Sequence, residues 1–387
     1  MPGGGLDLAG GWRGSLVQVR GDWQFYCQVF YFPAWNSNER MCPFCRASNV
    51  DKACLWTDFG PNATWRDRRW THESYLNFLR THGLAIPVFF LLVVGAIGFR
   101  LECITVDPLH AIDLGFSSHI VGNVFWYLSV IRNVFAATTY AQRISKLNTR
   151  LREWYNKTKC TSRIQGEITI ERLRKSAQHW PKLKAKAAAT RHVMAFVLEL
   201  VLMYATPDDP DFGTHDQLMI GVVQLIKRFY ELLDDNSMFF SAACLAEMVD
   251  IGNMLPNLYG QLADLCFEAG LKLWKLTPKI HLFQHLCLDQ VPSFGNPRYF
   301  WTYGDEDLVG QLVDIAIGVH PATLGVSVLF KWAVCVFEEV FFCQTSMTKM
   351  YRPLRGLTCS ILDRCHVSMH CCCRYARPRV IEIEKRR

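Results

Sequence analysis

Two cysteines in a short loop are the first candidate metal ligands. Residues 32–70 are rich in Trp, Pro, Asn and Cys, and they include the motif Cys42-Pro-Phe-Cys45. A CxxC pair can present two thiolates to one tetrahedral Zn²⁺. A redox pair of the thioredoxin type would be expected between a strand and a helix, a context that this loop lacks. Taken alone, the motif favours zinc binding or no function over redox chemistry.

Two histidines four residues apart form a second candidate pair. The segment LTPKIHLFQHLC contains His281 and His285, and Thr277 followed by Pro278 is typical of a helix start. Residues at i and i+4 share one helix face, which suits a divalent metal. No Glu follows His281, so this is not the zinc-protease motif. The pair either consists of ordinary core or surface histidines or completes one closed zinc site with the CxxC loop.

Acidic residues form two further candidates. In Asp107-Pro-Leu-His110 the proline holds Asp107 in an extended conformation, which predicts a strand end, a common place for a metal-binding carboxylate. A helix N-cap is equally natural for Asp107 and for Asp113. The consecutive acids at 305–307 either contribute to a site for two Mg²⁺ ions or form an acidic helix start that the helix dipole stabilises.

The elements that must position these residues are mostly helices. Alternating β-branched and aromatic residues at 15–31 predict a strand pair or a strand plus a short helix. Helical periodicity begins near residue 114 and predicts helices at 121–151, 169–204, 215–234, 239–270 and 320–342.

Composition limits the class of protein. The chain has 387 residues, 50% hydrophobic and 20% charged, which is enough for one large core or two smaller ones and excludes a disordered tail. Its sixteen cysteines are scattered through apolar segments, which favours reduced, intracellular thiols. The first residues lack the pattern of a secretory signal. We therefore expect an intracellular protein.

One apolar segment is a candidate for a membrane-spanning helix. Residues 84–99 form an apolar run of 16 residues, shorter than the about 20 that a spanning helix needs. A buried strand or core helix is the main interpretation, and a membrane segment is the alternative. The apolar stretch at 326–342 contains three charged residues and is predicted to be a core helix.

Positive charge is concentrated in one part of the chain. The net charge is +7, and residues 143–191 contain 14 Lys or Arg against 3 Glu, an excess of +11 that leaves −4 for the remainder. This basic segment is either a solvated helical face or a surface for nucleic-acid phosphates.

In their order along the chain, these clusters resemble the DDE/D transposases of the CACTA class, which have an RNase-H-like catalytic core. The resemblance covers residues 15–340. It implies an α/β remnant of an RNase-H-like core with a large all-α insertion, predominantly helical overall. The matching elements are Gly21-Asp22, Cys42 with Cys45, DPLH at 107–110, PKLKAKAAATRH at 181–192, PKIHLFQH at 278–285, and Glu306 with Gly310.

The resemblance also implies a role for each matching residue. Asp22 corresponds to the second catalytic aspartate and Glu306 to the closing glutamate, both metal-binding, while Asp107 and His110 correspond to a DxxH beside the active site. A structural Zn²⁺ would be held by Cys42, Cys45, His281 and His285. DNA would be contacted by a basic helix that includes Lys182, Lys184, Lys186 and Arg191.

One catalytic residue of the family has no counterpart. The first catalytic aspartate requires a strand well upstream, but only 21 residues precede Asp22, and Asp7 lies in a glycine-rich stretch. We therefore expect a truncated transposase-derived chain with severely impaired catalysis, in which Mg²⁺ or Mn²⁺ would act only if the centre were completed.

The expected organisation follows from these patterns. It comprises a disordered N-terminus at 1–14, a partial RNase-H-like core with the CxxC loop at 15–113, a helical insertion at 114–275, closing helices of the core at 276–345, and a disordered Cys-rich tail at 346–387.

The sequence thus predicts a nuclear, transposase-derived DNA-binding protein with one structural zinc, an incomplete catalytic centre and the capacity to form homo-oligomers. The alternatives are a membrane protein anchored by residues 84–99 and a helical scaffold without catalysis.

Overall fold

The structure is a computed structural model that describes residues 6–8, 12–14, 18–37, 39–87, 90, 100–320 and 323–329. The chain divides into two compact units. The large unit comprises Met1–Leu6 and Ser15–Tyr303, and the small unit comprises Asp7–Gly14 and Gly304–Arg387. Most of the apolar run at 84–99, most of the stretch at 326–342, and the whole tail at 346–387 lie outside the described residues.

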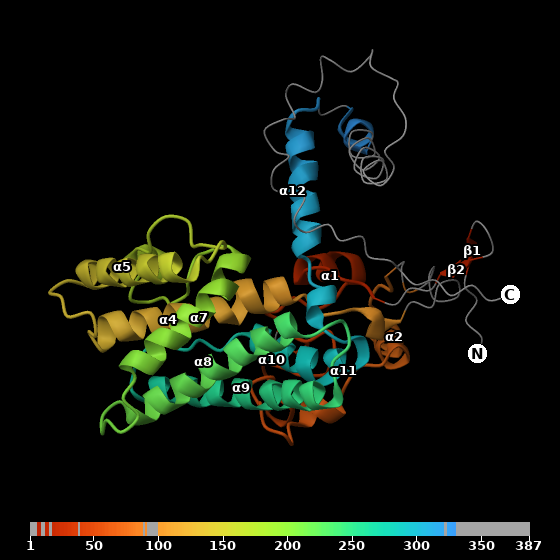
Figure 1. Cartoon of the computed structure of the whole chain (residues 1–387). Helices are drawn as coiled ribbons and strands as arrows, with labels where there is room; N and C mark the ends of the chain where they lie inside the picture. The colour runs from red at the N-terminus through yellow and green to blue at the C-terminus, as the bar shows by residue number, and fades with distance from the viewer. Residues whose placement is uncertain are drawn as a thin grey trace, which may run out of the picture. The chain divides into compact units, whose positions relative to one another are not determined.

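The large unit is built from helices (Figure 1). Its α-helices are α1 (Trp23–Phe30), α2 (His72–Thr81), α4 (Ser117–Trp126), α5 (Tyr140–Thr158), α6 (Ile170–Leu173), α7 (Ala187–Tyr204), α8 (Gly213–Asp235), α9 (Ala242–Glu268), α10 (Pro278–His285) and α11 (Val291–Phe294). Three π-helical segments, η4 (Leu109–Phe116), η5 (Tyr127–Ile131) and η6 (Leu286–Gln290), extend the neighbouring α-helices. Short 3₁₀ turns are η1 (Lys52–Cys54), η2 (Thr64–Asp67), η3 (Leu101–Cys103) and η7 (Pro297–Tyr299).

The prediction of an α/β core of the RNase-H type is wrong. The strands among the described residues are only β1 (Leu6–Leu8) and β2 (Trp12–Gly14), which pair with each other. Where a strand was expected near residue 19, Val19 forms an isolated parallel bridge with Ile104. The strand cannot continue because the Asp22 carboxylate accepts a hydrogen bond from Phe25 N at 2.6 Å and thereby starts α1. Of the predicted fold, only the predominance of helices agrees with the structure.

The core of the large unit forms between long helices. Helix α8 packs along α9 and against α7, and α4 also packs against α7 (Figure 1). On α8, the fully buried residues Met219, Val222, Ile226 and Phe229 follow the spacing of one helix face. The predicted helix at 215–234 is therefore confirmed, because an amphipathic period of this length has few other ways to bury its apolar side chains.

The basic segment is not one helix, contrary to the sequence prediction. Helix α6 ends at Leu173, and residues 174–186 are irregular or extended before α7 begins. The extended part is held by main-chain hydrogen bonds, from Lys182 N to Leu173 O and from Leu183 N to Ser118 O, each 2.8 Å long. A Cβ atom on Gly122 would lie 2.6 Å from the Lys182 backbone, so only glycine allows this close passage over α4.

Within the residues that the structure describes, two helical stretches are long and apolar enough to span a bilayer. They are Leu109–Ile131 and Ala187–Tyr204, of which 78% and 56%, respectively, of the most apolar window is buried inside the protein. Core helices and membrane helices both satisfy this test of length and composition.

Candidate metal centre

The two cysteines lie on a loop that is fixed by main-chain pairing. Arg46 N donates to Arg68 O at 3.0 Å, and Trp70 N donates to Phe44 O at 2.9 Å. Inside the loop, Phe44 N lies 3.4 Å from Cys42 Sγ, and Ala47 N lies 3.4 Å from Cys45 Sγ. Main-chain N–H groups that point at sulfur favour the thiolate, the form that binds metal.

The two histidines lie on α10, as the sequence predicts. Pro278 occupies the first turn, and His281 and His285 follow one turn apart, both fully buried. The helix is held in the core by Phe283, whose ring centroid lies 5.1 Å from those of Phe116 and Phe229. Because this packing fixes the helix, it also fixes the direction in which the two imidazoles point.

The structure brings the four predicted ligands together. One atom each from Cys42, Cys45, His281 and His285 lies within 4.8 Å of all the others. His281 Nε2 lies 3.2 Å from Cys45 Sγ and 3.2 Å from His285 Nε2. Around a tetrahedral Zn²⁺ with its usual bond lengths, neighbouring ligand atoms are roughly 3.3–3.8 Å apart. The cluster has the donor set of such a site, and its two 3.2 Å contacts are close to this spacing, while the limit of 4.8 Å for the other pairs is wider.

The side chains of the cluster shift one another's pKa values. Burial alone would raise the pKa of the Cys42 thiol, but its hydrogen bond to Cys45 and the charges of His285 and His281 hold that pKa well below its usual value. Burial would lower the pKa of His285, yet the Cys42 charge and the hydrogen bond to Asp289 raise it to about 9. Without a metal ion, the Cys42 thiolate is therefore balanced by protonated His285, and a bound ion would have to displace that proton.

Residues around the cluster orient it. His285 Nδ1 donates to Asp289 Oδ2 at 2.7 Å, which leaves Nε2 free to face the other ligands. Asp289 also forms a 2.6 Å ion pair with Arg69. The Trp65 ring lies edge-on against His281, with the centroids 4.5 Å apart. Sequence reasoning missed these residues, although the i, i+4 spacing of His285 and Asp289 was visible.

The cluster can hold an ion but is not arranged for chemistry on a substrate. All four ligand residues are buried, and the four side chains account for a complete tetrahedral set. Catalytic zinc sites instead keep one position open for water or substrate.

Asp107 lies elsewhere in the large unit, and both of its oxygens are occupied. Oδ1 accepts from Leu109 N and Thr302 N, and Oδ2 accepts from His110 N, His110 Nδ1 and Thr302 Oγ1, with distances from 2.6 to 3.2 Å. The carboxylate therefore starts the helical segment that begins η4, as the N-cap alternative describes. Its catalytic role stays a prediction.

Asp113 is the second buried carboxylate of this region. Tyr230 OH donates to it at 2.5 Å and Tyr303 OH at 2.7 Å. Burial raises the pKa of Asp113 to about 6 in spite of these two donors. We call Asp107, Asp113 and their donors the carboxylate network.

The other predicted site residues are separate from the metal cluster. Asp22 caps α1, and Glu306 lies in the first turn of α12 (Tyr303–Ile317), where acids suit the helix dipole. Among the predicted DNA contacts, Lys184 and Lys186 are exposed and Lys182 is half-buried. Arg191 is buried and pairs with Asp234 at 2.5 Å, so its guanidinium is already engaged.

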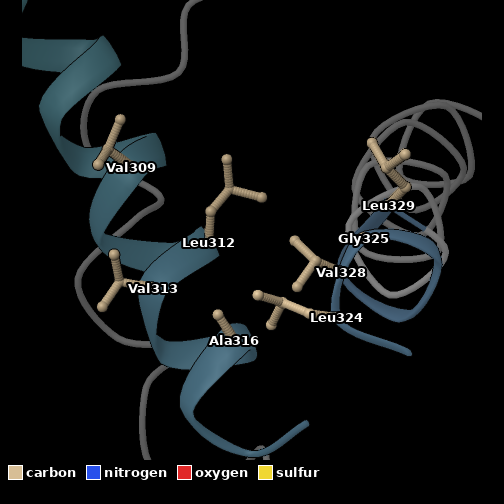
Figure 2. Close-up of a pocket in the computed structure, with 8 residues that line it drawn as sticks. All are labelled: Val309, Leu312, Val313, Ala316, Leu324, Gly325, Val328 and Leu329. Carbon is tan, nitrogen blue, oxygen red and sulfur yellow. The ribbon is translucent and has the colours of Figure 1, made fainter. Parts of the chain in front are cut away.

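The small unit contains an open apolar groove. Figure 2 shows its lining, which consists of aliphatic residues and one glycine from α12 and from residues 324–329. Because no polar or titratable side chain lines it, the groove offers no group for catalysis or metal binding.

Comparisons with known proteins add no assignment. No protein-family model matches the chain, and no curated protein matches it. The functional argument therefore depends on the geometry.

Proposed function

We propose that this chain is a DNA-binding protein whose fold is stabilised by one structural Zn²⁺. The observation that carries the proposal is the convergence of Cys42 and Cys45 with His281 and His285 in one buried cluster. DNA is the partner that the resemblance to CACTA-class transposases implies. The occupied oxygens of Asp107 support a chain without strand-transfer activity.

The donor set favours zinc over other divalent ions. Two thiolates with two imidazoles in a tetrahedral arrangement are typical of structural Zn²⁺, whereas Mg²⁺ and Ca²⁺ require oxygen ligands. The bound ion would connect the CxxC loop to α10, which are 236 residues apart along the chain between Cys45 and His281. Its contribution would be folding free energy rather than catalysis.

Metal analysis of the purified protein tests the zinc proposal. Protein made with zinc in the medium should contain about one ion per chain, and Cys42→Ser and His281→Ala should abolish stoichiometric binding. Cys54→Ser is the matched control, because Cys54 is a buried cysteine of the same region outside the cluster, and it should retain the ion. An ion-free wild type, or unchanged metal in His281→Ala, would refute the proposal.

Salt-dependent binding of a duplex tests the DNA proposal. The excess of +11 in residues 143–191 predicts an affinity that falls steeply between 50 and 200 mM salt. Zinc-loaded protein with no affinity for a labelled 20-base-pair duplex at 50 mM salt would refute DNA binding and leave the metal site intact.

A further inference from the structure

Four lysines from two distant segments gather on one part of the large unit. We call Lys182, Lys272, Lys275 and Lys279 the lysine cluster. The segments that carry them are joined by a 2.7 Å hydrogen bond from Lys272 Nζ to Gln178 Oε1. Lys272 and Lys275 also lie over the ring of Trp180, at 5.7 and 5.2 Å from its centroid.

The contacts of these lysines do not neutralise them. In the part of the chain that the structure describes, none of the four forms an ion pair within 4 Å with a carboxylate. Their partners are neutral: the Trp180 ring, the Gln178 amide and the main-chain carbonyl of His110, which Lys279 reaches at 2.7 Å. Trp180 thus holds two ammonium groups close together and leaves their charge available.

Neighbouring groups respond to this excess charge. Burial, together with the charge of Lys182, lowers the pKa of Lys279 to about 8, although the charge of Asp107 acts in the opposite direction. Burial and the same lysine lower the pKa of the His119 imidazole to about 3, with further contributions from Lys275 and Lys279. Burial is the largest cause of both shifts, and the contributions of Lys182, Lys275 and Lys279 agree with their closeness in the structure.

Close packing fixes two of the lysines. A Cβ atom on Gly115 would lie 2.7 Å from Lys279 Cδ, so the lysine stem crosses η4 directly over this glycine. The Lys182 backbone passes equally close to Gly122. Lys279 therefore stands on α10, and the main chain of Lys182 is held against α4, so the positions of these two residues are fixed before a ligand binds.

We propose that the lysine cluster is the surface that binds the phosphates of DNA, in place of the exposed pair Lys184 and Lys186 that the sequence suggested. This inference rests on the proposed DNA binding. Closely spaced cations without carboxylate partners fit a polyanion with regularly spaced charges, whose counterions are released on contact. Lys184 and Lys186 also form no ion pair within 4 Å among the described residues, but Trp180 brings Lys272 and Lys275 together, which favours this pair for phosphate binding.

Two double variants with equal charge test the location. Lys272→Gln/Lys275→Gln and Lys184→Gln/Lys186→Gln each remove two exposed positive charges. Affinity for a labelled 20-base-pair duplex is measured by fluorescence anisotropy between 50 and 200 mM salt. The first variant should bind about 10- to 60-fold more weakly at 100 mM, and its salt slope should fall by about 2. The second should stay within about threefold of the wild type.

The outcomes distinguish the location of the DNA-binding surface from the proposal that the chain binds DNA. Equal losses in the two variants, or a larger loss in Lys184→Gln/Lys186→Gln, would overturn the location and leave DNA binding standing. A wild type that binds no duplex would overturn both. Lys272→Arg/Lys275→Arg should recover most of the affinity, and one zinc per chain with an unchanged melting temperature would exclude misfolding as the cause of any loss.

Discussion

The metal cluster and the carboxylate network are both buried groups of titratable side chains, yet they differ in how fully their hydrogen bonds are satisfied. Asp107 accepts five hydrogen bonds from the protein itself. In the metal cluster, by contrast, the His281 Nε2 atom faces another imidazole Nε2 at 3.2 Å and the Cys45 sulfur at 3.2 Å, so the ligand atoms face one another.

This difference shows how a ligand site can be distinguished from a structural network of the same composition. A buried polar group without a partner costs free energy, so a cluster of such groups points to a component from outside the chain. A carboxylate whose lone pairs are all used has no capacity left for a cation. Residue types alone do not reveal which case applies, because the carboxylates seemed as plausible for metal as the thiols.

Removal of the metal should have the largest effect on stability. If it had no effect, the contrast between the metal cluster and the carboxylate network would not hold. We expect chelation, or Cys45→Ser, to lower the unfolding free energy by about 5 kcal/mol or more, below the about 10–16 kcal/mol of isolated zinc fingers. At about 2–4 °C per kcal/mol, the melting temperature should fall by at least about 10 °C. Differential scanning calorimetry before and after chelation, with Zn²⁺ added back, measures this. An unchanged melting temperature would show that the cluster is complete without an ion.

Loss of the Asp107 carboxylate should be the next largest effect. Asp107→Ala deprives the side chains of His110 and Thr302 and three main-chain N–H groups of an acceptor, which should cost about 3–5 kcal/mol. Urea denaturation measures the loss, and metal content should remain at one ion. Asp208→Ala, at an exposed carboxylate, should change stability by no more than about 0.5 kcal/mol. Loss of metal in Asp107→Ala would contradict the separation of the two regions.

The second carboxylate predicts a pH dependence. Burial raises the pKa of Asp113 from 3.8 to about 6, so the folded state holds this proton more tightly than the unfolded state. Stability from this group is therefore fully present below about pH 4 and declines as the pH rises through 6, by at most about 3 kcal/mol. The stability of Asp113→Asn relative to the wild type should increase over this range and level off near pH 7. Urea denaturation from pH 4 to 7.5 tests it, and a constant difference would contradict the raised pKa.

Replacement of Asp289, the hydrogen-bond partner of His285, should have the smallest effect. Asp289→Asn weakens the hydrogen bond that orients the imidazole, and such changes typically reduce metal affinity 10- to 100-fold, about 1.4–2.7 kcal/mol. Competition with a chromophoric chelator measures the affinity, while saturating zinc should still give one ion per chain. Asp264→Asn, at an exposed residue, is the control. An unchanged affinity would show that the ring needs no such orientation.

The four metal ligands were accessible to sequence reasoning because each pair carries a local signal. CxxC spacing and the i, i+4 histidines after Thr277-Pro278 are properties of short segments, and a shared ion is the simplest reason to combine them. Trp65 was not accessible, since nothing local connects an aromatic residue at 65 to a helix at 278. Asp289 had a local signal that was overlooked.

The fold was predictable only where the helical period was long. Helix α8 follows its apolar period closely, but the alternation at 15–31 gave one isolated bridge because Asp22 caps a helix there. The basic segment was misjudged because Leu183 N bonds to the main chain of Ser118, far away in sequence, a contact that no periodicity encodes.

The distance along the chain between the two ligand pairs has a consequence for protein synthesis. Cys42 and Cys45 leave the ribosome long before α10, since Cys45 and His281 are 236 residues apart. At about 5–20 residues per second, roughly 12–50 s pass before the histidines emerge. Throughout this time the two thiols lack their partners and are open to oxidants and competing metals. For the proposed zinc site, correct assembly would therefore depend on a reducing, zinc-supplied environment during translation as well as on the finished fold.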